Sequence, residues 1–404
     1  MNIIFFVENN RAGGVDTFLI NLINAWPSKS DNLILLCNKS HPGIVFIKKS
    51  LRRKIKIKTH QIPISHNIVK YYLSKLPIFL KKICGQLLRL FLSYYQYKEL
   101  KKIFKMIDAD RLMVINGSYP GGETSRLANI AWLNVRKKKS IHNFHNLAIR
   151  PRKLTAFYEN YIDKLLLGSV SSIIGVSKAC SGSIKIRKTF TNYRKISTIY
   201  NGIPLPGKKE NHTFQIRKKA KIKKGKICVM LGTYEERKGH DFLFNSFEII
   251  WKKFPDTHLV VFGDSDEADF ERVSKLRLNK KSKNNIHLFR YIPDGSKLIN
   301  QADILLVSSQ HSESFGLTIV ESMIRKVPVV STNIGGLSEV IGKNGTAAYK
   351  CDPANYKDYT NKIIKVLNNK LIRDKITKNG YKRAKSKFMV AGMAEKYRQL
   401  LIHD

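Results

Sequence analysis

Short apolar segments alternate with longer amphipathic segments along almost the whole 404-residue chain. This alternation indicates β-strands followed by helices, and such βαβ units build parallel sheets that are covered by helices. We expect ten strands, near residues 3–7, 33–37, 112–115, 140–144, 172–176, 227–231, 258–262, 286–289, 304–307 and 327–331. The sequence therefore predicts an α/β protein.

A break in this pattern divides the chain in two. The stretch from Asn201 to Gly207 contains two glycines and two prolines, which interrupt regular structure. The polar and basic residues 208–226 follow, as a linker would, and a new strand then begins. We predict one domain at 1–203, a second at 204–385 and a terminal helix at 386–404.

The charge of the chain is strongly positive. Lysine and arginine number 73 against 30 acidic residues, which gives a net charge of +43. Such a charge attracts nucleic acid, anionic membranes or phosphate-bearing substrates, although a lysine-rich composition alone also produces it. A nucleic-acid-binding protein should interleave basic and aromatic residues or contain a recognisable binding module, and we find neither.

The cysteines and the apolar segments bear on the location of the protein. The five cysteines are scattered and form no C-x-x-C pair, so we expect neither a disulfide framework nor a zinc site, and a reducing cytoplasm fits. The N-terminus reads as a strand and not as a signal peptide. No segment approaches the ~20 apolar residues of a membrane-spanning helix. We expect a cytoplasmic bacterial protein that lies peripherally on the inner membrane.

One segment is unusually basic. Between Asp31 and Asp108 the only acidic residue is Glu99. Apolar residues at steps of three and four share one helix face there, namely Leu73, Leu76, Leu80, Ile83, Leu87, Leu90 and Tyr94. Basic residues fall on the opposite side, and Pro77 would kink or delay the helix. Residues 48–105 would either bind an anionic membrane or pack on their own sheet with the basic face in solvent.

The strongest signal for a site is the segment from Ser309 to Glu321, which follows an apolar strand and leads into a helix. Serines and Gly316 at such a turn leave backbone N–H groups at a helix N-terminus, where phosphate binds. Glu313 and Glu321 are eight residues apart, and their carboxylates can accept hydrogen bonds from sugar or ribose hydroxyls. Glu313 alone would more simply be a helix cap.

Two further loops follow strands. In the loop at 231–239, Arg237 and Lys238 are placed to neutralise a diphosphate leaving group, although they could also belong to a generally basic surface. Near the N-terminus, the paired Gly13 and Gly14 allow close approach of a ligand to the backbone, but the full G-x-G-x-x-G pattern is absent.

Two other patterns raise the question of a metal. His142 and His145 lie at a strand end, and we find no third ligand at a useful spacing. A histidine there could also bind a sugar hydroxyl or be purely structural. Asp264 and Asp266 form an Asp-x-Asp pair, for which helix N-capping is the preferred interpretation.

Together these motifs resemble those of the retaining GT-B glycosyltransferases of family 4, which include bacterial polysaccharide and lipopolysaccharide glycosyltransferases. The most specific part is the E-x7-E segment from Glu313 to Glu321, and residues 327–339 resemble the strand and Gly-Gly turn that follow it. The resemblance implies two facing Rossmann-like domains with a central cleft. It also implies a C-terminal helix that crosses back to the first domain.

The resemblance implies roles for the matched residues. Arg237 and Lys238 would bind the donor diphosphate, Glu313 the donor sugar and Glu321 the ribose, with His145 near the sugar. The catalytic residues would be His145, Glu313, Lys238 and Arg237. The donor-binding residues would be Gly13, Gly14, Val15, Gly232, Thr233, Arg237, Lys238, Tyr291, Ile292, Glu313, Ser314, Phe315, Gly316, Leu317, Thr318 and Glu321.

Two positions depart from the family pattern. Thr233 stands where the family often has an arginine, so that one phosphate-binding charge is missing. Arg290 stands where the family often has a glycine before the aromatic residue, here Tyr291. The second departure leaves the identity of the nucleotide open.

The implied activity is that of a retaining hexosyltransferase. It would move a hexose or N-acetylhexosamine from a nucleotide sugar, with UDP favoured and GDP possible, onto a lipid-linked glycan or a cell-surface polysaccharide precursor. We expect neither a metal nor another cofactor. The alternatives are a GT-B nucleotide-sugar epimerase, which needs no acceptor, and a non-enzymatic basic nucleic-acid-binding protein.

Overall fold

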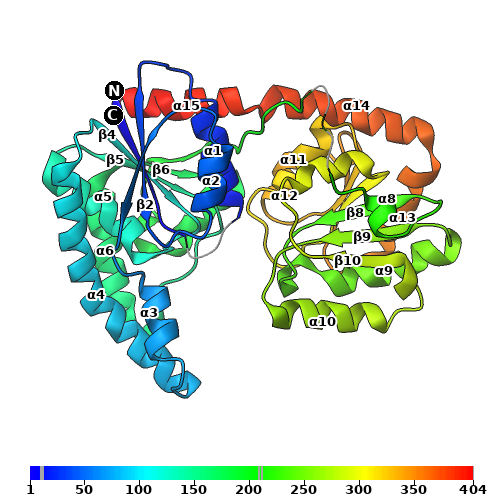
Figure 1. The fold of residues 1–404 in the computed structure, drawn as a ribbon, viewed down its shortest axis with the longest axis horizontal. Coiled ribbons are helices and arrows are strands. Elements are labelled where there is room, and N and C mark those ends of the chain that lie inside the picture. The colour runs from blue at the N-terminus through cyan, green and yellow to red at the C-terminus, as the bar shows by residue number, and fades with distance from the viewer. Residues whose placement is uncertain (10–12, 208–209, 211–212, 404) are drawn as a thin grey trace. The chain divides into compact units, whose positions relative to one another are not determined.

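The computed structural model describes residues 1–9, 13–207, 210 and 213–403. The chain forms two compact units (Figure 1): unit 1 contains residues 1–202 and 390–404, and unit 2 contains residues 203–389. Each unit has one parallel sheet flanked by helices, so the predicted architecture of two Rossmann-like domains is confirmed. None of the helices in the described ranges has the length and apolar content needed to span a bilayer.

Unit 1 contains a seven-stranded parallel sheet in the order β3-β2-β1-β4-β5-β6-β7. Its strands are β1 (Asn2–Val7), β2 (Asn32–Asn38), β3 (Lys56–His60), β4 (Arg111–Asn116), β5 (Ser140–Phe144), β6 (Val170–Gly175) and β7 (Ile196–Thr198). The strand order reverses between β1 and β4, which pair in parallel with Ile3 opposite Arg111. Loops at the carboxyl ends of such a pair diverge and leave room for a ligand.

Helices cover both faces of this sheet. They are α1 (Gly14–Asn24), α2 (Ile44–Ser50), α3 (Ser65–Tyr72), α4 (Ile78–Met106), α5 (Glu123–Arg136), α6 (Ala156–Ser169), α7 (Lys178–Ser183) and α15 (Val390–His403). One core lies under α1 and α15 and includes Phe18 and Tyr397. The other lies under α4, α5 and α6 and includes Phe104 and Trp132, whose rings pack edge to face.

Unit 2 contains a six-stranded parallel sheet in the order β10-β9-β8-β11-β12-β13. Its strands are β8 (Ile227–Leu231), β9 (His258–Phe262), β10 (Ile286–Phe289), β11 (Ile304–Val307), β12 (Val329–Thr332) and β13 (Tyr349–Cys351). Its helices are α8 (Ile216–Lys219), α9 (His240–Lys253), α10 (Glu267–Leu278), α11 (Leu317–Ile324), α12 (Gly336–Ile341), α13 (Tyr356–Asn368) and α14 (Lys370–Lys387). Here the strand order reverses between β8 and β11.

All ten expected strands are present, within about two residues of their expected positions. The sequence pattern did not predict β3, β7 and β13, which lie at sheet edges or are only three residues long. In β3, exposed lysines alternate with the residues that face the sheet, so no apolar run marks the strand.

The expected linker at 208–226 is wrong where the structure describes it. Residues Ile216–Lys219 form α8, and Ile216 and Ile222 are buried in unit 2. The backbone N–H of Ile216 donates to the side chain of Gln301 at 2.8 Å. This segment is therefore part of unit 2. The two buried isoleucines anchor it there, although lysines surround them in the sequence.

The single helix expected from the basic segment is divided. Helix α3 ends at Tyr72, and Pro77 is the N-cap of α4, because a proline lacks the N–H that a helix interior needs. Of the seven apolar residues that the periodicity marked, Leu80, Leu87 and Tyr94 are exposed and the other four are half-buried. Phe91 is a further exposed apolar residue on the same side of α4. Residues Leu80, Leu87, Phe91 and Tyr94, which we call the outward stripe, are between 44% and 78% exposed.

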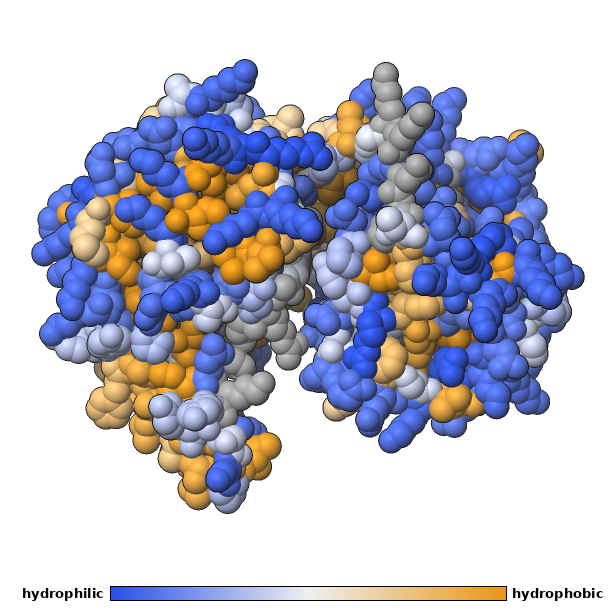
Figure 2. Space-filling model, in the orientation of Figure 1, coloured by the Kyte–Doolittle hydropathy of each residue, from blue (hydrophilic) through white to orange (hydrophobic). Residues whose placement is uncertain are grey.

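The buried residues of α4 that precede Leu100 are small or polar, namely Gly85, Ser93 and Gln96. The packing alternative placed the whole apolar face on the sheet and the basic face in solvent. The structure contradicts it for Leu80, Leu87 and Tyr94, whereas the other four residues of that face are half-buried. Figure 2 shows hydrophobic side chains gathered over the tip formed by α3 and the start of α4.

The last helix, α15, packs on unit 1 although the whole of unit 2 precedes it in the chain. The amide of Asn143 donates to the hydroxyl of Tyr397 at 2.8 Å, and Tyr397 also packs edge-on against Phe18. At the surface, the Arg398 guanidinium lies 2.9 Å from the carboxylate of Asp31. The helix is thus held by an apolar contact, a buried hydrogen bond and an ion pair.

We predict that Tyr397→Ala lowers the free energy of unfolding of unit 1 by about 3–5 kcal/mol, because it leaves a cavity in a buried core. Tyr397→Phe should cost about 1 kcal/mol, since only the hydrogen bond is lost. Urea unfolding of the full chain, followed by the fluorescence of the tryptophans, measures both. Equal effects of the two substitutions would contradict the packing described for α15.

Candidate active site

The second half of the chain brings two of the predicted motifs together at one edge of its sheet. Strands β8 and β11 are neighbours, with Ile304 opposite Cys228, and the strand order reverses between them. The loop after β8 carries Arg237 and Lys238, and the loop after β11 carries Glu313. Because both strands are parallel, both loops emerge at the same edge.

Lys238 and Glu313 form an ion pair at the centre of this site. The ammonium Nζ lies 2.5 Å from Glu313 Oε2, and both side chains are about 15% exposed. The hydroxyl of Ser309 donates to the same carboxylate oxygen at 3.2 Å, and Arg237 Nη1 lies 3.7 Å away. Two cations and one anion therefore converge on one small volume.

The charge state of Glu313 follows from these neighbours. Its burial acts to raise the pKa of the carboxyl, but the Lys238 ammonium and then Arg237 hold the pKa of Glu313 below its usual value of 4.5. Glu313 is accordingly a carboxylate near neutral pH. It can accept hydrogen bonds and balances one of the two positive charges beside it.

Arg237 is oriented by Glu235 and Ser312, which the sequence motifs did not single out, and by Thr233 through Glu235. Its Nε donates to the carboxylate of Glu235 at 2.7 Å, and the hydroxyl of Thr233 donates to the same oxygen at 3.1 Å. Its Nη1 donates to the carbonyl of Ser312 at 3.4 Å. Thr233, which replaces an expected arginine, thus helps to hold Arg237 in place. Glu235 could have been singled out from the sequence, because acidic residues are rare in this chain and it lies two positions before Arg237.

Glycines let the Glu313 loop fold closely against the turn after β12. At Gly335 the backbone has a φ of 49°, and an added Cβ would lie 2.2 Å from the carbonyl oxygen of Glu313. The N–H of Gly336 donates to that same carbonyl at 2.9 Å. Gly316, with a φ of 91°, is the N-cap of α11, which begins at Leu317 without a side-chain cap. The capping alternative for Glu313 is therefore wrong, since its carboxylate binds Lys238.

The remaining residues of the E-x7-E segment differ in accessibility. Phe315 is buried against Phe388, so that only its backbone is available to a ligand. Glu321 lies on α11, where burial raises its pKa against the opposing effect of Arg325, and Glu210 raises it further. Arg325 is itself bound to Glu210 at 2.9 Å. Glu210 was not predicted as part of this region.

The residues that follow β10 include an exposed aromatic ring. The side chain of Tyr291 is 58% exposed. Its neighbour Arg290 binds the carboxylate of Glu267 at 2.6 Å and lies over the ring of Phe270, 3.7 Å from the centroid. Arg290, which departs from the family pattern, is therefore held by α10 and the residues next to it.

The two histidines of the first half lie in unit 1 and differ in their surroundings. His142 is fully buried in β5, where its Nδ1 lies 2.8 Å from the amide of Asn129. His145 follows β5 and packs edge-on against Phe18, and its Nε2 has no hydrogen-bond partner among the described residues. Burial lowers the pKa of both to about 3, so that both are neutral at physiological pH. His142 is structural.

The glycine loop of unit 1 is described only in part, because residues 10–12 lie outside the described ranges. Gly13 is the N-cap of α1, and its N–H donates to the carboxylate of Asp16 at 3.0 Å. Gly13 and Gly14 are exposed, and Val15 is half-buried. Contact of this loop with a ligand stays a prediction.

Within the described ranges, no group of three or more His, Cys, Asp and Glu side chains is arranged to hold a metal ion. Asp266 accepts a hydrogen bond from the backbone N–H of Asp269 at 3.0 Å and so caps α10. The preferred interpretation of the Asp-x-Asp pair as a helix cap is confirmed.

The family model "Glycosyl transferases group 1" matches residues 211–383, which include the loops after β8 and β11. The chain is a glycosyltransferase of the GT-B fold. It is 23% identical over 302 residues to the capsular polysaccharide biosynthesis glycosyltransferase CapM of Staphylococcus aureus, which covers 72% of this chain and 78% of CapM.

Two solved structures are similar over essentially the whole length of the glycosyltransferase. Anabaena HepE in complex with UDP and glucose has a TM-score of 0.75 at 14% identity, with 100% of both chains covered. A mutant of S. aureus TarM in complex with fondaparinux, α-GlcNAc-glycerol and UDP has a TM-score of 0.70 at 14% identity, with 99% of both chains covered. At this identity the likeness shows the fold.

We predict that the Lys238–Glu313 pair stabilises the glycosyltransferase in a pH-dependent way. Lys238→Met should lower the free energy of unfolding at pH 7 by up to about 3 kcal/mol, because it removes one partner of a buried pair while Arg237 remains. Since the pKa of Glu313 is depressed on folding, this contribution is complete above pH 4.5 and is lost as the pH falls further.

The measurement is urea unfolding of both proteins at pH 7 and at about pH 3.5, where linkage predicts a smaller difference between them. Lys375→Met, at an exposed position of α14, is the matched control and should have little effect. A difference that grows on acidification would contradict the assigned pair.

Proposed function

We propose that this protein transfers a hexose or N-acetylhexosamine, with retention of anomeric configuration, from a nucleotide sugar to a lipid-linked glycan or polysaccharide precursor. UDP is the favoured nucleotide, and GDP is the second candidate. The observation that carries the proposal is the convergence of Lys238, Arg237 and Glu313 at the carboxyl ends of β8 and β11. Lys238 and Arg237 place two positive charges at the position where the diphosphate leaving group would lie.

In the proposed reaction the bond between the sugar and the diphosphate breaks, and negative charge builds up on the departing nucleotide. Lys238 and Arg237 would stabilise that charge, together with the uncapped N-terminus of α11. Glu235 holds Arg237 in position, which reduces the reorganisation needed when the donor binds. The amides of Ser314 to Thr318 and of Thr233 would bind phosphate and sugar oxygens. Gly232 would contribute only close approach of its backbone, because its N–H donates to the carbonyl of Phe262 at 3.0 Å.

Glu313 would accept hydrogen bonds from hydroxyls of the donor sugar, since it is ionised and its carboxylate is placed between the two cations. Glu321 would bind the ribose, and Tyr291 and Ile292 would contact the base, for which the exposed ring of Tyr291 offers a stacking surface. No metal or other cofactor takes part in this proposal, because Lys238 and Arg237 supply the positive charge.

Unit 1 would contribute His145 and the backbone of Gly13, Gly14 and Val15. His145 is neutral, and its unpartnered Nε2 makes it suited to a hydrogen bond with a sugar hydroxyl and unsuited to act as a cation. The exposed glycines would approach the donor phosphates.

The comparisons support both substrates of the proposal. The HepE and TarM structures contain UDP, and CapM is named for capsular polysaccharide biosynthesis. A second relative, from Klebsiella pneumoniae, is named for its place in a cps region. An epimerase is disfavoured because CapM and a further relative, YtcC, are named as glycosyltransferases.

We predict that Lys238→Ala lowers the rate of nucleoside diphosphate release from the preferred nucleotide sugar by about 10²- to 10³-fold, because it removes charge stabilisation from the transition state. The donor is found by screening hydrolysis of common UDP- and GDP-sugars by the unaltered protein. Lys375→Ala is the control, and a rate unchanged by Lys238→Ala would exclude the phosphate role.

We further propose that the enzyme binds the anionic surface of the inner membrane through α3 and α4. The outward stripe exposes large apolar side chains on the surface of unit 1, and the exposed Lys75, Lys82 and Lys98 lie along the same segment. Apolar insertion and attraction to anionic lipid act together at such a surface. This position would place the enzyme beside a lipid-linked acceptor.

The membrane proposal predicts that the protein sediments with vesicles of phosphatidylglycerol at low ionic strength and is released by salt. The double substitution Leu87→Glu and Phe91→Glu should abolish sedimentation, because it puts charge into the outward stripe. Leu371→Glu changes a leucine that is 81% exposed on unit 2 and should have no such effect. No sedimentation of the unaltered protein would end the proposal.

A further inference from the structure

Unit 1 contains a cavity of about 270 Å³ at the carboxyl ends of β1 and β4, where the strand order reverses. It is enclosed by the loops after β1, β4 and β5 together with α4 and the residue before α3. Its lining includes Glu8, Asn116, Arg89, Glu123 and Arg152. The donor site described above uses none of these residues.

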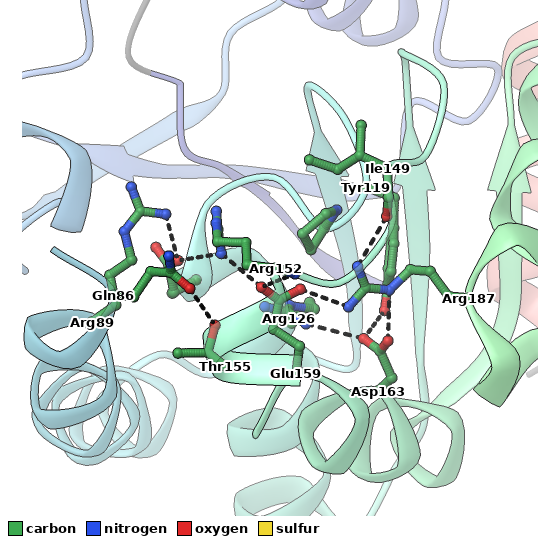
Figure 3. A network of polar contacts seen from close by, with 12 residues as sticks. Gln86, Arg89, Tyr119, Arg126, Ile149, Arg152, Thr155, Glu159, Asp163 and Arg187 are labelled. Atoms are coloured by element: carbon green, nitrogen blue, oxygen red, sulfur yellow. Dashed lines mark hydrogen bonds and ion pairs between the residues drawn. The ribbon is translucent and has the colours of Figure 1, made fainter. Parts of the chain in front are cut away.

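Two arginines of the cavity converge on one carboxylate. Arg89 Nη1 lies 3.3 Å and Arg152 Nη1 lies 3.7 Å from Glu123 Oε1, and the two arginines come from separate segments of the chain (Figure 3). Arg152 also binds Glu159 at 2.9 Å. The side chains of Arg89 and Arg152 are 21% and 29% exposed, and both line the cavity.

The charges behind the cavity leave it positive. Arg187 binds Glu159 and Asp163, and Arg126 also binds Asp163. Figure 3 shows these groups as one continuous network with Arg89 and Arg152. Four arginines are thus paired with three acidic side chains, Glu123, Glu159 and Asp163, and one positive charge is in excess.

Glu8 does not cancel this excess at neutral pH. It is 7% exposed, and its Oε2 has no hydrogen-bond partner among the described residues. Burial, and to a lesser degree the charge of Glu123, raises the pKa of Glu8 to about 8. A protonated carboxyl that lines the same cavity as two arginines can donate a hydrogen bond to an anion bound there.

An apolar groove of about 480 Å³ adjoins the cavity, and Ile64 lines both. The groove runs beside α3, and its apolar lining includes Ile62, Ile68, Tyr71 and Tyr72. The two aromatic rings are more than 70% exposed and pack edge to face. The surface therefore changes from charged to apolar over a short distance.

We propose that the cavity binds the phosphodiester or diphosphate of an amphiphilic acceptor, and that the groove holds the first part of its hydrocarbon chain. This inference rests on the proposed function, in which the acceptor is lipid-linked, and assigns the acceptor's phosphate to Arg89, Arg152 and Glu8. Arginine suits this role because its planar fork of donors matches a phosphate group.

The test uses three soluble probes and calorimetry on the full-length protein. Lysophosphatidylglycerol, below its micelle concentration, offers the phosphodiester and the chain. Monoacylglycerol offers the chain alone, and glycerophosphoglycerol offers the headgroup alone. We expect the first probe to bind about 10- to 100-fold more tightly than monoacylglycerol, as charged hydrogen bonds allow. Equal affinity of these two would overturn the phosphate site, and equal affinity of the first and third would overturn the chain groove.

Substitutions then locate the binding. Arg152→Met should weaken binding of lysophosphatidylglycerol about tenfold or more. Arg89→Met provides a second variant if Arg152→Met is poorly folded. It removes only the ion pair with Glu123, whereas Arg152 pairs with both Glu123 and Glu159. Arg150→Met is the matched control, because Arg150 is exposed and does not line the cavity. An equal loss in the control and in both variants would overturn the assignment.

The pH dependence of the affinity for lysophosphatidylglycerol tests the role of Glu8, because a purely structural role of Glu8 would not change it. The charged side chains that line the cavity with Glu8 are Arg89, Arg152 and Glu123. As the pH rises through about 8, ionisation of Glu8 adds a negative charge, so affinity for the phosphodiester should fall, although the probe keeps one charge throughout. Glu8→Gln should remove this fall, and a wild-type profile that is flat between pH 7 and pH 9 would overturn the role of Glu8.

Binding of UDP, measured on the same preparation, tests the donor site independently of the acceptor site. Binding of UDP without binding of lysophosphatidylglycerol would overturn the acceptor site and leave the donor site intact. Binding of lysophosphatidylglycerol by a protein that hydrolyses no nucleotide sugar would support the cavity and count against the proposed transferase reaction.

Discussion

The ion pair between Lys238 and Glu313 connects two loops that are 75 residues apart in sequence. Each loop leaves one of two neighbouring parallel strands at the point where the strand order reverses, and the N–H of Gln310 also joins the loops by donating to the carbonyl of Arg237 at 2.8 Å. The pair keeps Glu313 ionised, while Glu235 and Ser312 orient the neighbouring Arg237. The close turn at Gly335 sets the position of the Glu313 backbone, because a side chain there would collide with it. Both halves of the proposed phosphate site depend on this arrangement.

The sequence predicted the elements with strong apolar patterns and missed those without them. Strands such as Ile227–Leu231 and Ile304–Val307 are continuous apolar runs because helices cover both faces of a parallel sheet. Lys56–His60 lies at an edge and carries lysines, and its pairing partner could not be inferred from composition. The same limit applies to Glu235 and Glu210, whose roles arise from neighbours that are distant in sequence. Lys238 and Glu313 were predicted in separate motifs, and their contact depends on the order of the strands.

Helix α4 shows what periodicity leaves open. A stripe of apolar residues at steps of three and four identifies a helix face, but it does not say which way that face points. Here the protein interior receives Gly85, Ser93 and Gln96, while Leu87 and Phe91 are exposed. The inward side also carries Arg89 to the cavity beside Glu123. One helix thus has two different surfaces, since Arg89 on its inward side lines a charged cavity and large apolar side chains are exposed on its outward side.

The return of α15 to unit 1 has a consequence for synthesis on the ribosome. Met393, Tyr397 and Leu401 belong to the same core as Phe18, yet they are translated after the whole of unit 2. The apolar surface that α15 covers on unit 1 therefore stays exposed until residues 203–389 and α15 itself have been translated. A premature stop codon that removes only the final helix would leave that surface open for good, and such a product would be a substrate for chaperones and proteases rather than a shortened enzyme.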